Sequence, residues 1–70
     1  MKIFAKKLKE AREKQGLTQK ELAEELGIPL RTYTNYETLG RGNTSPSFEL
    51  LVRLSELLYV TTDFLLGLGE

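Results

Sequence analysis

Residues 18–37, with the sequence TQKELAEELGIPLRTYTNYE, decide the fold because they specify two short helices and the turn that joins them. Thr18 and Glu21 have the spacing of a capping box, in which each side chain pairs with a backbone amide left free at a helix start. The first helix therefore begins at Gln19. It ends at Gly27, since glycine adopts the left-handed conformation that terminates a helix. Pro29 opens the next segment, because the first helical turn tolerates proline.

The segment after Pro29, residues 30–37, places Tyr33 and Tyr36 three apart, which predicts a helix with both rings on its core face. Its threonines and tyrosines would also suit a strand, but the alternation is poor and the sequence contains no partner strand. Counted from Gln19, a small residue is fifth (Ala23), Gly27 is ninth, and the tyrosines are fifteenth and eighteenth. This is the spacing of a helix-turn-helix, whose second helix is presented to the major groove of DNA.

The flanking sequence predicts three more helices and no strand. An apolar stripe runs through residues 2–15, which end before Gly16, and residues 38–46 are rich in glycine and polar side chains and form a loop. Residues 47–58 carry the clearest apolar stripe, and Thr61 caps a last short helix that ends before Gly67. The expected fold is a compact all-α domain of five helices spanning residues 1–70. The stripe of the fourth helix contains Phe48, Leu51, Leu54, Ser55 and Leu58.

The composition excludes most enzyme chemistry. The 70 residues contain no Cys and no His, so the chain has no disulfide, thiolate nucleophile, imidazole base or soft metal cluster. The chain's candidate catalytic carboxylates fall on solvated helix faces, so we expect no enzyme activity, no cofactor, no metal site and no small-molecule substrate. They are Glu10, Glu13, Glu21, Glu24 and Glu25. No apolar run is long enough to span a bilayer, and we expect a cytoplasmic protein that does not contact membranes.

The charges balance overall but are unevenly distributed. Ten basic and ten acidic residues give a formal net charge of zero, whereas DNA-binding domains tend to be basic. Residues 1–47 hold nine basic and six acidic residues, a charge of +3, and residues 48–70 hold one and four, a charge of −3. The positive excess thus lies in the part that contains the helix-turn-helix. The neutral total implies modest non-specific affinity for DNA.

Six strings together resemble the lambda-repressor and Cro type of helix-turn-helix domain, the xenobiotic-response-element family of bacterial and phage regulators. This resemblance covers the chain throughout its length and implies a sequence-specific regulator of transcription that binds double-stranded operator DNA. The strings are LKEAR at residues 8–12, GLTQKELA at 16–23, LGI at 26–28, NYE at 35–37, PS at 46–47 and TTDFLL at 61–66.

The resemblance also implies roles for individual residues. Arg31 is the best candidate for reading a base, since a guanidinium can bond O6 and N7 of guanine together. Arg12 and Glu37 match an internal ion pair between the first and third helices. The base-reading candidates are Leu30, Arg31, Thr32 and Asn35, and the phosphate-binding candidates are Gln19, Thr34, Tyr36, Arg41, Asn43 and Thr44.

The chain departs from the family pattern at several positions. Pro29 and Leu30 replace polar groups at the start of the recognition helix, so the first reading position is apolar. The loop at residues 38–46 is longer than usual. Tyr59 occupies a position where the family generally has glycine, and Ser55 one where it usually has alanine.

One such domain makes few base contacts, and the family binds as dimers on paired half-sites. We expect a homodimer, acting as a repressor, that pairs through an exposed apolar patch near the C-terminus. The alternative is a protein-interaction module on the same fold, an antitoxin or an antirepressor partner. The patch contains Leu50, Leu57, Phe64, Leu66 and Leu68.

Overall fold

A computed structural model describes residues 2–38 and 46–68, which fold into five helices and no strand. The predicted all-α class is therefore confirmed, and helix α3 has the predicted bounds. Helices α1 and α4 are each one residue shorter than predicted, at the C-terminal and N-terminal end respectively. The helices are α1 (Lys2–Lys14), α2 (Gln19–Leu26), α3 (Leu30–Glu37), α4 (Phe48–Leu58) and α5 (Thr62–Leu66).

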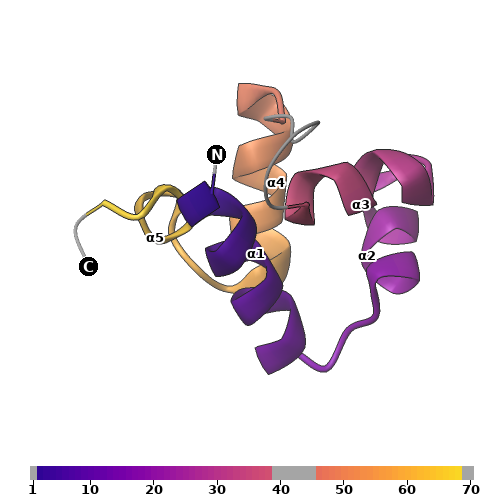
Figure 1. The fold of residues 1–70 in the computed structure, drawn as a ribbon, viewed down its shortest axis with the longest axis horizontal. Helices are drawn as coiled ribbons and strands as arrows, with labels where there is room; N and C mark the ends of the chain where they lie inside the picture. The colour runs from indigo at the N-terminus through magenta and orange to yellow at the C-terminus, as the bar shows by residue number, and fades with distance from the viewer. Residues whose placement is uncertain (1, 39–45, 69–70) are drawn as a thin grey trace.

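Helix α1 lies between the helix-turn-helix and the C-terminal helix, and it contacts both α3 and α5 (Figure 1). Helix α2 contacts α3 and α4, and α4 in turn contacts α5. Each helix contributes at least one fully buried side chain to the single core that these contacts enclose. These side chains are Phe4, Leu8, Leu22, Tyr33, Leu54, Leu58 and Leu65.

Both ends of α2 are held by the capping residues that the sequence predicted. Thr18 Oγ1 accepts from the Glu21 amide at 3.0 Å, and Glu21 Oε1 accepts from the Thr18 amide at 2.9 Å. Gly27 has a φ of 72°, and the amide of Ile28 donates back to the carbonyl of Ala23 at 3.1 Å. Helix α3 can therefore begin at Leu30, with Pro29 as its N-cap residue.

The end of α2 is also tied to α4 through Arg53. Its guanidinium donates to the carbonyls of Glu25 at 2.9 Å and Leu26 at 3.4 Å, which have no partner within a helix that ends there. Ser55, at a position where the resemblance leads us to expect alanine, is buried, and its hydroxyl donates to the carbonyl of Val52 at 2.7 Å. Both polar side chains are thus compatible with close packing of α4.

Phe48 is a correction to the predicted stripe of α4, because 77% of it is exposed. It is the first residue of the helix, and the contacts of α4 with the core begin at Leu50 and Leu51. The remaining members of the predicted stripe are buried or half-buried.

Tyr59 has the backbone conformation that glycine adopts most easily, and glycine is the residue that the resemblance leads us to expect there. Among the described residues it is the one non-glycine residue with positive φ, at 58°, and it forms the left-handed C-cap of α4. Its side chain is 83% exposed, so little packing offsets the backbone strain.

We predict that Tyr59→Gly stabilises the domain by about 1 kcal/mol, because glycine adopts left-handed backbone without the Cβ clash. Urea denaturation followed by circular dichroism measures the change. Tyr59→Ala is the matched control: it removes the same ring but keeps Cβ, and we expect little or no stabilisation. Equal gains in the two variants would contradict the strain explanation.

Candidate nucleic-acid interface

Helix α3 has an inner face that is fixed in the core and an outer face that is open. Tyr33 is fully buried and Tyr36 is 8% exposed, and their rings meet edge to face with centroids 6.3 Å apart. Leu30, Arg31, Thr34 and Asn35 are exposed on the opposite side. At 100° per residue, Arg31 and Thr34 lie nearest the middle of this outer face.

The four predicted base-reading residues differ in how much of each is exposed to solvent. Leu30 is 45% exposed, and Arg31 and Asn35 are also exposed. Thr32 is only half-buried, at the border of the inner face, because it lies next to Tyr33 and one turn before Tyr36. The outer face therefore presents Arg31 with Leu30, Thr34 and Asn35 around it.

The Glu37 carboxylate at the end of α3 accepts four hydrogen bonds. Oε2 accepts from Arg12 Nε at 2.7 Å and from the Tyr33 hydroxyl, and Oε1 accepts from Arg12 Nη2 at 3.2 Å and Gln19 Nε2 at 2.9 Å. Arg12 also donates from Nη1 to the carbonyl of Leu17 at 2.7 Å. We call this set of side chains, Arg12, Gln19, Tyr33 and Glu37, the Glu37 cluster. It joins α1, α2 and α3.

Both charges of the cluster are removed from solvent, with 10% of the Arg12 side chain and 3% of the Glu37 side chain exposed. Burial alone raises the pKa of Glu37, but the hydrogen bonds from Arg12, Tyr33 and Gln19 outweigh it, so the pKa lies below the ordinary glutamate value. The hydrogen bond to Glu37 raises the pKa of Arg12. Burial, followed by the bond to Glu37, raises the pKa of Tyr33. Glu37 is therefore an anion and Tyr33 a donor at neutral pH.

Gln19 is the member of the cluster that reaches the surface. It is half-buried at the first position of α2, where helix amides lack partners within the helix. The capping box and the first helical turn use the amides of Glu21 and Leu22. Within the described residues, the amides of Gln19 and Lys20 donate to no intramolecular acceptor, so they remain available to an anion at this end of the helix.

Three lysines near this surface were not among the predicted contacts. Lys20 is exposed at the second position of α2. Lys6 and Lys9 are exposed on α1 and line a shallow recess of about 360 Å³ together with Ala5, Glu10 and Glu37. The sequence patterns did not single them out, because the packing of α1 beside the end of α3 is a tertiary feature.

The three loop candidates Arg41, Asn43 and Thr44 lie outside the described residues. Tyr36, the remaining phosphate candidate, is part of the core cluster, and its 8% exposure leaves little surface for contact.

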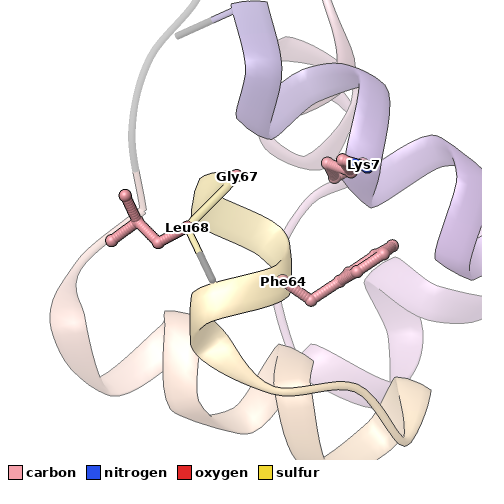
Figure 2. Close-up of a pocket in the computed structure, with 4 residues that line it drawn as sticks. All are labelled: Lys7, Phe64, Gly67 and Leu68. Carbon is pink, nitrogen blue, oxygen red and sulfur yellow. The ribbon is translucent and has the colours of Figure 1, made fainter. Parts of the chain in front are cut away.

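The predicted dimer patch is less continuous than the sequence indicated. Leu68 is 56% exposed, whereas Leu50, Leu57, Phe64 and Leu66 are half-buried. Figure 2 shows the Phe64 ring extending from α5 toward α1, where Lys7 Nζ lies 4.9 Å from the ring centroid, and Leu68 turned away from it. Lys7, Phe64 and Leu68 line a shallow recess between α1 and the C-terminal end. Leu57 lines a separate recess, whose other walls include Leu17, Leu22 and Tyr59.

The described residues, 2–38 and 46–68, contain no group of three or more potential metal-ligating side chains of His, Cys, Asp or Glu. Within the same residues, every helix is too short or too polar to cross a bilayer.

Comparison with known proteins identifies the family. A model of the helix-turn-helix family matches residues 8–65. The chain belongs to this family. The predicted resemblance to lambda-repressor and Cro type domains is thereby confirmed, and a helix-turn-helix domain of this type is not an enzyme, as the composition indicated.

Two relatives of this helix-turn-helix chain come from Bacillus subtilis (strain 168). The chain is 49% identical to the HTH-type transcriptional regulator ImmR over 67 residues, which are 96% of the chain and 50% of ImmR. It is 39% identical over 64 residues to an SPbeta prophage-derived uncharacterized HTH-type transcriptional regulator, YonR, with 91% and 56% covered. The chain spans about half the length of the curated relatives it matches.

We predict that the stability supplied by Glu37 is lost in acid. Because its pKa is lowered on folding, the contribution is complete above the ordinary pKa of about 4.3 and declines as pH falls through the lower, folded value. Glu37→Gln should cost about 3 kcal/mol at pH 7 and progressively less below about pH 4. Urea denaturation across pH 2.5–7 (about 10 points) measures the difference.

The matched control for this prediction is Glu24→Gln, on the exposed face of α2. We expect a small effect with little pH dependence. If the cost of Glu37→Gln stayed constant down to the lowest pH, the ionised carboxylate would not be the stabilising group.

Proposed function

We propose that this chain is the DNA-binding part of a transcription regulator, and that it inserts α3 into the major groove of a double-stranded operator. The observation that carries the proposal is the two-sided character of α3: the tyrosines of its inner face are buried, and Arg31 stands on an exposed outer face. A helix anchored in this way can present base-reading side chains without losing core contacts. The relatives, named as HTH-type transcriptional regulators, support the same assignment.

In this proposal the outer face of α3 reads bases. Arg31 pairs with guanine through O6 and N7, Asn35 reads adenine, and Leu30 contacts thymine methyl groups. Thr32, at the border of the face, contacts a thymine methyl from the side.

Side chains around α3 hold the phosphate backbone. Gln19 and Lys20 do so from the start of α2, where the free amides and the helix dipole also favour an anion. Thr34 adds a contact from the exposed side of α3, and the lysines of α1 extend the positive surface. The hydroxyl of Tyr36 adds a lesser contact, through the 8% of that residue that is exposed. The loop residues Arg41, Asn43 and Thr44 complete the proposed set.

We also propose that the chain acts as a homodimer on paired half-sites and represses by occupying the operator. The C-terminal end of the domain supports pairing there, since Leu68 is exposed next to the half-buried Phe64 and Leu66. This end is remote from the α3 outer face, because α1 lies between α3 and α5 (Figure 1). Two copies can therefore pair without covering their reading helices.

We predict that Arg31→Ala relaxes the preference for one base pair. Selection of bound sites from random duplex DNA should yield a motif with the wild-type chain. With the variant, one guanine of that motif should no longer be preferred, because Arg31 supplies about 1–3 kcal/mol of discrimination against other bases there. Lys20→Ala is the matched control, since it removes a charge without removing a base contact. It should preserve the motif and lower the slope of log affinity against log salt by about 1.

Two outcomes would contradict this assignment. Failure of the wild-type chain to enrich any motif would exclude the sequence-specific regulator and favour the protein-interaction alternative. An unchanged motif with Arg31→Ala would show that Arg31 does not read bases.

We predict that Leu68→Asp shifts the dimer toward monomer, because it places a charge in the proposed apolar contact. Sedimentation velocity at high micromolar concentration measures the change. Leu30→Asp is the control, since it puts the same charge on an exposed leucine of α3, which α1 separates from α5 and the proposed contact. A wild-type monomer with and without the selected duplex would refute the dimer.

A further inference from the structure

The side-chain amide of Gln19 has one orientation that its neighbours permit. A carboxylate only accepts hydrogen bonds, so the group that faces Glu37 Oε1 at 2.9 Å must be the nitrogen, Nε2. The carbonyl oxygen of the same amide then faces the Thr34 hydroxyl, which donates to it at 3.5 Å. Both ends of the amide are therefore defined by groups of α3.

The acceptor that fixes Gln19 is itself immobile. Arg12 binds both oxygens of Glu37, and Tyr33 binds one of them, so three hydrogen bonds set the carboxylate plane before Gln19 is counted. Four donors match the roughly four lone-pair sites of an ionised carboxylate. Glu37 has no capacity left for a further donor, and its side chain is 3% exposed, so it is shielded from DNA.

We propose that Glu37 is a positioning residue for DNA binding: it fixes the Gln19 amide so that the second N–H of Nε2 is presented to a backbone phosphate. This inference rests on the proposed function and deepens it. No acceptor within the described residues takes that second N–H. The N–H belongs to a half-buried residue at the start of α2, beside the unpaired amides of Gln19 and Lys20.

The benefit of this arrangement is preorganisation. A free glutamine side chain would lose rotamer freedom when it contacts a phosphate, and that loss weakens binding. In this chain the loss occurs on folding, since Glu37 already holds the amide. Removing Glu37 should therefore weaken DNA binding by an amount that depends on Gln19.

A double-mutant cycle separates positioning from stability. The four proteins are the wild type, Gln19→Ala, Glu37→Gln and the double variant, each measured at a temperature where urea denaturation shows it to be fully folded. Binding to one fixed 20-base-pair duplex (about two helical turns) is followed by fluorescence anisotropy at constant salt. In Glu37→Gln one carboxylate oxygen becomes an NH2 donor that faces either Gln19 and Arg12 Nη2 or Tyr33 and Arg12 Nε, so in either orientation the set of bonds that fixes the Gln19 amide is broken.

We expect Gln19→Ala and Glu37→Gln each to weaken binding by roughly three- to tenfold, and the double variant to be no weaker than the weaker single variant. Effects that multiply in the double variant would overturn the inference, because Glu37 would then act independently of Gln19. Failure of the wild type to bind the duplex would instead refute the proposed function, so the two failures are distinguishable.

A second variant covers the case in which Glu37→Gln does not fold. Tyr33→Phe removes one donor to Glu37 but keeps the buried ring, and Tyr33 is 0% exposed, so it cannot touch DNA itself. We expect a two- to threefold loss of affinity that disappears in the Gln19→Ala background. Tyr59→Phe, the same change on an exposed residue, is the control and should have no effect. An equal loss from Tyr33→Phe with and without Gln19 would also overturn the inference.

Discussion

The Glu37 carboxylate is the point on which the arrangement of the first three helices depends. It lies at the C-terminal end of α3, where the helix dipole disfavours an anion, and it is almost wholly buried. It stays ionised because Arg12 from α1, Gln19 from α2 and Tyr33 from α3 donate to it. Breaking a buried pair by removing one partner leaves an uncompensated charge, so the packing of α1 against α3 is set by this group.

This constraint has a direct bearing on DNA recognition. The bonds that hold the inner side of α3 leave its outer side open, and Arg31 and Thr34 lie at the middle of that side. The same bonds reach Gln19 at the start of α2. They therefore join α3 to the start of α2, the two parts that in our proposal read bases and bind phosphate. A chain with no net charge gains little from non-specific attraction, and such rigid placement of a few contacts compensates in our proposal.

Much of the fold follows from local sequence signals. The capping residues Thr18 and Thr61 and the left-handed Gly27 have fixed stereochemical roles, and so the helix limits at residues 19, 62 and 26 agree with the pattern. Phe48 was misplaced because an apolar stripe shows which face is buried, not where along the helix the contacts begin. Tyr59 was recognised as unusual from the sequence, but its left-handed backbone required the structure.

The candidate site was predictable in part, since helical periodicity places Arg31 and Asn35 outward once Tyr33 and Tyr36 are assigned to the core. Periodicity did not distinguish Thr34, near the middle of the outer face, from Thr32 at its border. The hydrogen bonds of Gln19 and Tyr33 to Glu37 join side chains 18 and 4 residues apart. The bond from Gln19 depends on how α2 and α3 cross, which no local pattern encodes, whereas Tyr33 and Glu37 are neighbours one turn apart on α3. The lysines of α1 beside Glu37 likewise depend on tertiary packing.

The central claim is that α3 and the start of α2 form the DNA-binding surface. Titration of the isotopically labelled chain with a duplex, followed by amide chemical shifts, tests it most directly. The account predicts that the shifts concentrate at residues 19–21 and 30–35 and are small in α4 and α5 at a concentration where the dimer is already formed. Shifts concentrated in α4 and α5, with α3 unaffected, would contradict it.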